Sequence, residues 1–68
     1  MFRLVHARYD RKTYRAYVEL RGPDDDGGEI LASAIFSFRS STFLTDRQIE
    51  REIVRKARYV MKRAAAAT

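Results

Sequence analysis

The stretch FLTDRQIEREIVRKARYVMKR, residues 43–63, decides the fold of this chain. Apolar residues recur in it at steps of three and four, which is the spacing that lines one face of an α-helix. They are Ile49, Ile53, Val54, Ala57, Val60, Met61 and, just beyond the stretch, Ala64. No glycine or proline interrupts the pattern, so the stretch predicts one amphipathic helix.

A capping pattern marks the start of this helix. The hydroxyl oxygen of Thr45 can accept a hydrogen bond from the first turn, and Gln48 completes a capping box three residues later. Asp46 at the start and Lys62 near the end complement the helix dipole. Because alanine favours helix, we expect the helix to continue through residues 64–67 toward the C-terminus.

The side of the helix opposite the apolar face carries five basic residues, again at steps of three and four, which we call the basic stripe. They are Arg47, Arg51, Arg55, Arg58 and Lys62. At about 100° per residue, the stripe lies roughly 140° from the centre of the apolar face. Two interpretations stay open. The stripe is either a solvated helix surface, since arginine is a good helix former, or a binding surface for an anion.

Three segments before the helix show the alternation of half-buried strands. Residues 13–21, TYRAYVELR, alternate most clearly, and residues 29–39, EILASAIFSFR, follow the same pattern. Residues 2–9, FRLVHARY, alternate less regularly. Residues 10–12 form a polar connector, in which we expect the side chain of Asp10 to hydrogen-bond the turn.

Short connectors between three strands and a following helix predict an α+β fold in a single domain of residues 1–68. The three strands form an antiparallel β-meander, and the long C-terminal helix packs on one face of the sheet (β-β-β-α). The predicted core comprises Phe2, Leu4, Tyr14, Ala16, Val18, Leu20, Ile30, Ala34, Phe36 and Phe38 of the sheet and Ile49, Ile53, Ala57, Val60 and Met61 of the helix. His6 falls on the same inner face, where we expect a hydrogen-bonded core residue and not a catalytic group.

The segment GPDDDGG, residues 22–28, has the strongest turn signal in the chain and predicts a hairpin tip. Its three adjacent aspartates raise the question of a calcium site. An EF-hand loop, however, spreads its ligands over a longer segment and ends in a bidentate glutamate. We therefore expect a solvated acidic tip and no metal site.

Length and composition exclude several other classes of protein. The chain has 68 residues, no cysteine and one histidine, so neither a disulfide nor a zinc site is expected, and no cofactor is predicted. A chain this short buries only about 60% of the surface that its unfolded form exposes, so a second copy or a ligand would add stability. The sequence shows no nucleophile–base pair and no phosphate-binding loop, which argues against an enzyme and a small-molecule substrate.

The sequence also bears on location. No apolar run is long enough to span a bilayer, and the first residues lack the apolar core of a signal peptide. We expect a cytoplasmic protein with no membrane partner.

Charge is distributed unevenly along the chain. The net charge is +5, and the isoelectric point is about 10.1. Residues 22–29 carry −4, whereas residues 1–21 and residues 46–68 each carry +4. Such a basic domain favours polyanionic partners, with nucleic acid first.

If the helix covers one sheet face, the other face is open to solvent. Its predicted residues are Arg3, Val5, Ala7, Tyr9, Arg15, Tyr17, Glu19, Arg21, Leu31, Ser33, Ile35, Ser37 and Arg39. Arginine matches phosphates and guanine edges, and tyrosine stacks on bases. This favours a nucleic-acid-binding module that uses the open face or the basic stripe, for DNA or RNA. Alternatively, the apolar group of Val5, Tyr17, Leu31 and Ile35 indicates a homodimer or another protein interface.

Three features of the chain carry a family resemblance: YRAYVELR at residues 14–21, a third strand that ends at Phe38, and a helix start at Thr45. In this order they resemble the small DNA-binding domains made of a three-stranded sheet and a helix, such as integrase arm-binding domains and plant AP2 domains. The resemblance implies a sheet that lies in the major groove and touches bases and phosphates. The residues it assigns to nucleic-acid binding are Arg3, Arg15, Tyr17, Arg21 and Arg39.

Overall fold

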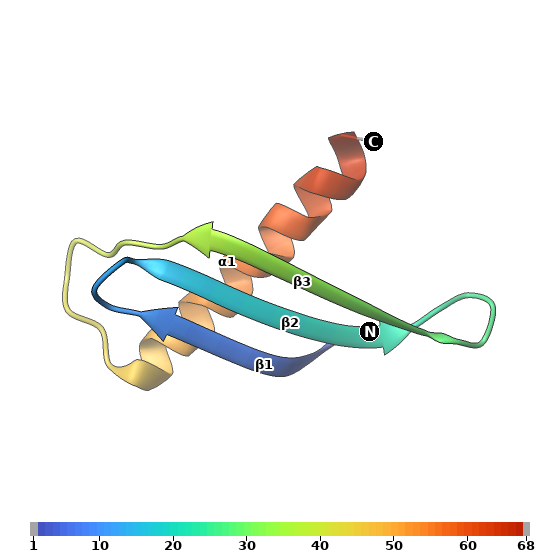
Figure 1. Ribbon diagram of the computed structural model, residues 1–68, viewed down its shortest axis with the longest axis horizontal. Coiled ribbons are helices and arrows are strands. Elements are labelled where there is room, and N and C mark those ends of the chain that lie inside the picture. The colour runs from blue at the N-terminus through green and yellow to red at the C-terminus, as the bar shows by residue number, and fades with distance from the viewer. Residues whose placement is uncertain (1, 68) are drawn as a thin grey trace.

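A computed structural model describes residues 2–67 of the chain. It contains the strands β1 (Arg3–Asp10), β2 (Arg15–Pro23) and β3 (Glu29–Ser37) and the helix α1 (Asp46–Ala67). The strands form one antiparallel sheet in the order β1-β2-β3, and α1 crosses one of its faces (Figure 1). The predicted α+β meander with a C-terminal helix is therefore confirmed.

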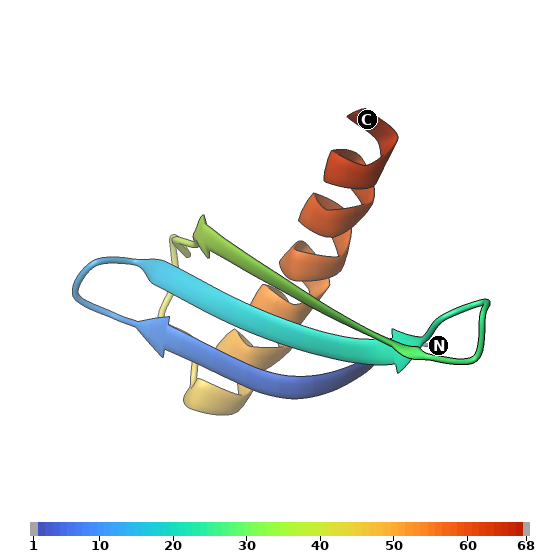
Figure 2. The same cartoon turned by 45° about the vertical axis from the view of Figure 1, so that its right-hand side comes forward.

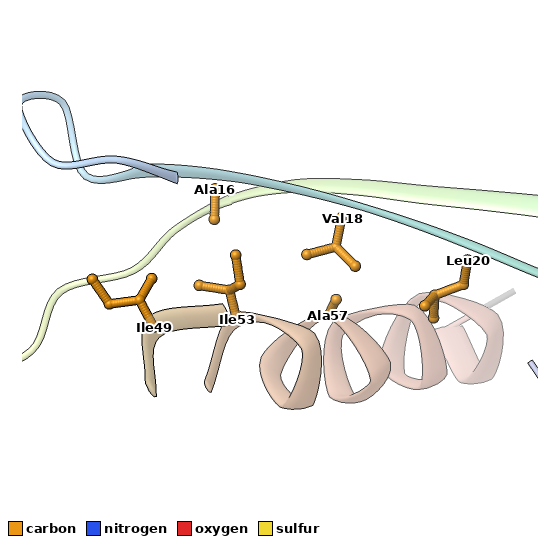
Figure 3. Packing of buried hydrophobic residues seen from close by; sticks show 6 residues of the cluster. All are labelled: Ala16, Val18, Leu20, Ile49, Ile53 and Ala57. Carbon is orange, nitrogen blue, oxygen red and sulfur yellow. The ribbon is translucent and has the colours of Figure 1, made fainter. Parts of the chain in front are cut away.

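The core lies between the central strand β2 and the first half of α1. Three side chains of β2 point toward three of α1, and none of the six is more than 6% exposed (Figure 3). They are Ala16, Val18, Leu20, Ile49, Ile53 and Ala57. Period-2 spacing on the strand and period-3.6 spacing on the helix place these residues on the facing surfaces, as the sequence predicts.

A β-bulge in β1 makes part of the predicted face assignment wrong. Leu4 pairs with Leu20, but His6 pairs with Glu19, so Val5 is an extra residue in the strand. An extra residue moves every later side chain of the strand to the opposite face. His6 therefore lies on the outer face opposite Glu19 and not in the core.

The same bulge corrects the positions of three further residues of β1. Ala7 and Tyr9, predicted on the open face, instead pack against the core, and the hydroxyl of Tyr9 donates a hydrogen bond to the carbonyl of Phe38 at 2.7 Å. Arg8 lies on the open face, where it pairs with Tyr17 of β2. The bulge thus exchanges two apolar side chains for a histidine and an arginine on the open face.

Tyr14 is a second correction, because β2 begins only at Arg15. Tyr14 lies in the β1–β2 turn with a positive φ of 60° and is 39% exposed, so it is not a core residue. Its amide donates to the carbonyl of Asp10 at 2.8 Å. The predicted side-chain bond of Asp10 is confirmed, since its carboxylate accepts from the amide of Lys12 at 2.8 Å.

Two other predicted core residues lie on the inner face but are exposed. Leu4 pairs with Leu20, and Ile30 pairs with Gly22, which places both on the side of α1. They lie on the edge strands, toward the end of the sheet that α1 leaves uncovered (Figure 1).

The capping box at the start of α1 is confirmed. The amide of Gln48 donates to the hydroxyl oxygen of Thr45 at 3.3 Å, and the amide of Thr45 donates to the side-chain oxygen of Gln48 at 2.9 Å. Because α1 continues to Ala67, its last turn contains no basic residue. The helix continues through the alanines as predicted, and Lys62 lies before its last turn, where the interaction with the helix dipole is weak.

Two arginine contacts connect the sheet to the start and to the middle of α1. Arg11 in the β1–β2 turn forms an ion pair with Asp46 at 2.9 Å. Arg58 donates a hydrogen bond to the carbonyl of Phe2 at 3.2 Å. These contacts join the helix to the turn and to the start of β1.

The acidic hairpin tip is shorter than predicted. Gly22 belongs to β2, and the tip is closed by a hydrogen bond from the amide of Asp24 to the carbonyl of Gly28 at 2.9 Å. Gly27 has a φ of 89°, which only glycine adopts readily. Among residues 2–67, no three histidine or carboxylate side chains gather into a potential metal site. Nor does α1, as far as it is described, combine the length and apolar character that crossing a bilayer requires.

Candidate nucleic-acid interface

The domain has two exposed basic surfaces. One is the sheet face that α1 leaves open, which we call the outer face, and the other is the basic stripe on α1. Because α1 packs on the inner face through the side of the helix opposite the stripe, the two surfaces point in opposite directions (Figures 1 and 2).

Tyr17 lies at the centre of the outer face. It pairs with Arg8 on β1 and with Ile35 on β3. These three side chains and Arg15 line a shallow, open depression beside the β1–β2 turn. The outer face thus combines an aromatic ring with arginines, a combination that suits stacking on a base beside phosphate contacts.

A carboxylate lies beside this ring. The hydroxyl of Tyr17 donates a hydrogen bond to Glu19 at 2.7 Å, and this bond is the largest cause of a raised pKa of Tyr17. The ring of His6 lies 6.1 Å from that of Tyr17, centroid to centroid. The negative charge of Glu19 at the centre of the outer face opposes the approach of a phosphate.

The arginines predicted for the outer face are only partly brought together. Arg3 and Arg21 pair across β1 and β2, and Arg21 also forms an ion pair with Glu29 at 3.7 Å. Arg39 lies past the end of β3, where its guanidinium stacks on the ring of Tyr14 at 4.4 Å. The side-chain hydrogen bond with Tyr14 raises the pKa of Arg39. Arg39 is therefore held at the turn end of the sheet and not on the strands.

The basic stripe is exposed at all five positions. Arg55 forms an ion pair with Glu52 at 3.7 Å, and Arg58 contacts a backbone carbonyl. Within residues 2–67, the side chains of the remaining three stripe residues, Arg47, Arg51 and Lys62, form no hydrogen bond or ion pair. With a rise of about 1.5 Å per residue, the stripe extends for about 22 Å along α1.

Arg8 and His6 are the outer-face residues that sequence reasoning missed. One signal could have found them: Leu4 and Val5 are adjacent apolar residues, and after them residues 6–10 alternate in the opposite phase. Two apolar neighbours followed by a change of phase are typical of a bulged strand.

Comparisons with models of protein families, with curated proteins and with solved structures found no match to this chain. The resemblance to integrase arm-binding and AP2 domains stays a prediction. The class that fold and surfaces define is a small β-β-β-α domain with a basic helix on one side and an arginine- and tyrosine-bearing sheet on the other.

Proposed function

We propose that this chain is a small nucleic-acid-binding module that contacts phosphates through the basic stripe of α1. The observation that supports the proposal is that Arg47, Arg51 and Lys62 are exposed cations on one rigid helix with no acidic partner in the described chain. Phosphate contacts by such residues release counterions from the nucleic acid. They supply most of the non-specific affinity of a protein for nucleic acid.

The stripe suits phosphates better than the outer face does. On the outer face, Glu19 lies next to Tyr17, and Glu29 pairs with Arg21. On the stripe, one carboxylate, that of Glu52, pairs with one arginine. The acidic hairpin tip projects from the end of the sheet that α1 does not cover, so its charge lies away from the start of the stripe (Figure 1).

The outer face supports two secondary roles. Arg3, Arg15, Tyr17 and Arg21 are available for contacts with bases and phosphates in the manner that the family resemblance implies. Alternatively, the outer face is a protein interface, because Leu31 and Ile35 are 56% and 67% exposed on it, and Ile35 pairs with Tyr17. Val5, the fourth member of the predicted apolar group, is exposed at the bulge.

A salt titration with charge-matched variants tests the proposal. Labelled DNA and RNA, each as a duplex and as a single strand, are titrated with protein at several salt concentrations. We expect the logarithm of affinity for a DNA duplex to fall linearly with the logarithm of salt, with a slope of about 0.9 for each phosphate contacted. The preferred nucleic acid then identifies the target class.

Two triple variants remove three positive charges each from opposite sides of the molecule. We expect Arg47→Gln with Arg51→Gln and Lys62→Gln to weaken binding and flatten the salt slope. The control, Arg3→Gln with Arg15→Gln and Arg21→Gln, has the same net charge and should retain most of the affinity. The reverse order of effects would assign binding to the outer face, and no binding at low salt would overturn the proposal.

A further inference from the structure

The two edges of the sheet are protected to very different degrees. β1 carries a bulge and the charged residues Arg3, Arg8 and Asp10, which are features that discourage pairing with another strand. β3 pairs with β2 without any shift of register, and residues 30–37, ILASAIFS, contain no charge and no proline. The edge formed by β3 is therefore an open template for another strand.

The hydrogen-bond pattern shows which backbone groups of β3 are free. The amide of Phe38 donates to the carbonyl of Tyr14 at 2.8 Å, so Phe38 and Tyr14 form a hydrogen-bonded cross-strand pair. Hydrogen-bonded and non-hydrogen-bonded pairs alternate along an antiparallel ladder. Even-numbered residues of β3 therefore bond to β2, whereas the odd-numbered Leu31, Ser33 and Ile35 direct their amides and carbonyls to the open edge.

A side chain of α1 confirms this assignment. The ammonium group of Lys56 donates to the carbonyl of Ser37 at 2.5 Å, which places that odd-numbered carbonyl outside the β2–β3 ladder. Lys56 thereby also marks the end of the open edge.

From these observations we propose that β3 pairs antiparallel with β3 of a second copy of this chain, and that the dimer contains one continuous six-stranded sheet. If the whole of β3 pairs with the whole of β3 of the second copy, Ser33 lies opposite Ser33 of that copy. This register aligns the free amides and carbonyls of Leu31, Ser33 and Ile35 with those of Ile35, Ser33 and Leu31 of the second copy.

This register is self-complementary in its side chains. On the outer face it sets Leu31 opposite Ile35 of the second copy, twice, so that the two strongly exposed apolar residues of β3 cover each other. On the inner face it sets Ala32 opposite Ala34 of the second copy, and these small side chains leave room under the helix.

Charge favours the same antiparallel arrangement. Glu29 begins β3 beside the acidic tip, whereas Lys56 and Arg39 lie at the far end, where β3 finishes. Antiparallel pairing brings Glu29 of each copy next to Lys56 and Arg39 of the other. A parallel pairing would instead set the two acidic tips side by side.

The second half of α1 extends past the β3 edge (Figures 1 and 2). Its exposed flank there forms a shallow hollow lined by Lys56, Tyr59, Val60, Arg63 and Ala64. A two-fold axis at the centre of β3 brings both helices to the same side of the joint sheet. Each helix then covers part of the partner's sheet, and Tyr59, which is 59% exposed in one copy, becomes buried.

Ser33→Pro tests this pairing because it removes one outward amide and adds a ring at the open edge. The β2–β3 ladder does not use that amide, and proline is tolerated on edge strands, so the variant should keep its fold. Ser33→Ala is the matched control, since it removes the hydroxyl and keeps the amide. Sedimentation equilibrium over a wide concentration range should give dimers for the wild type and Ser33→Ala and monomers for Ser33→Pro.

Hydrogen exchange of the wild type gives a second readout that does not depend on the variant's folding. In the dimer, the amides of Leu31, Ser33 and Ile35 should exchange slowly, and dilution to monomer should make them fast. A wild type that stays monomeric would overturn the proposal and leave the β3 edge to a strand of another protein. A dimer that survives Ser33→Pro, or in which these amides exchange fast, would also overturn it in favour of pairing through the outer face. None of these outcomes depends on nucleic-acid binding.

Discussion

The aromatic ring of Phe2 lies against the backbone of Gly22, so close that a Cβ atom on residue 22 would overlap the ring. Gly22 is buried within β2, and its φ is not positive. The glycine is therefore required for space and not for an unusual backbone conformation. Through this contact, the residue before β1 covers the end of the core.

Gly22→Ala should destabilise the fold because the new methyl group forces the Phe2 ring out of its site. We expect the free energy of unfolding to fall by about 1–3 kcal/mol in urea denaturation. Gly28→Ala is the control, since its Cβ would meet only the Asp24 side chain at ordinary contact distance. In a Phe2→Ala background, Gly22→Ala should cost much less, and an equal cost there would contradict the proposed contact.

The capping box makes the start of α1 sensitive to substitution of Thr45. Thr45→Ala removes the hydroxyl that accepts from Gln48, and we expect a loss of about 1 kcal/mol in the free energy of unfolding. Thr13→Ala serves as the control, because Thr13 contacts Asp10 through its backbone amide, which the substitution keeps. Equal thermal midpoints for the two variants would show that the cap contributes nothing.

The sequence predicts the helix, the strand order and the β2–α1 core because each depends on local periodicity. Ile49, Ile53 and Ala57 on one side and Val18 on the other follow from the spacing of apolar residues alone. The capping box at Thr45 follows from two residues three apart. These features need no knowledge of which distant residues meet.

The wrong predictions concern residues whose position depends on pairing with a neighbouring strand or on the geometry of a turn. Val5 becomes the extra residue of a bulge only because Leu4 and His6 pair with consecutive residues of β2, and this moves Arg8 into the candidate site. Tyr14 leaves the core because the turn requires a residue with positive φ at that position. The alternation of apolar and polar residues within one segment reveals neither the register of strand pairing nor the backbone conformation of a turn.

The pair of Tyr17 and Glu19 predicts a stability change at alkaline pH. The hydrogen bond to Glu19 raises the pKa of Tyr17 above its ordinary value of 10.0. The unfolded chain therefore loses this proton at lower pH than the folded protein does. The stabilisation is present below pH 10 and is lost as pH rises through the raised pKa of the folded state.

An NMR titration of the Tyr17 ring carbons measures this pKa directly. We expect Glu19→Gln to lower the pKa of Tyr17 toward its ordinary value, because the acceptor loses its negative charge. Glu52→Gln on α1 is a charge-matched control that leaves the Tyr17 hydrogen bond intact. If both variants give the same pKa as the wild type, the hydrogen bond to Glu19 does not control the ionisation of Tyr17.

The bulge in β1 predicts that one residue of this small domain can be deleted without unfolding it. Without Val5, Leu4 and His6 become adjacent, and they already pair with the adjacent residues Leu20 and Glu19. Every other side chain keeps its partner and its face, so we expect the free energy of unfolding to change by less than about 1 kcal/mol.

Deletion of Ala7 is the contrasting variant, because it places the polar side chain of His6 opposite Val18, at the inner-face position that Ala7 occupies. We expect this variant to lose most of its cooperative unfolding transition. The Val5 deletion should differ from the wild type mainly in self-association, because it converts β1 into a regular edge strand. Cooperative thermal unfolding of the Val5 deletion, measured by circular dichroism at low concentration, would support the bulge. If neither deletion variant shows a cooperative thermal transition, Val5 is part of a regular strand and the bulge is wrong.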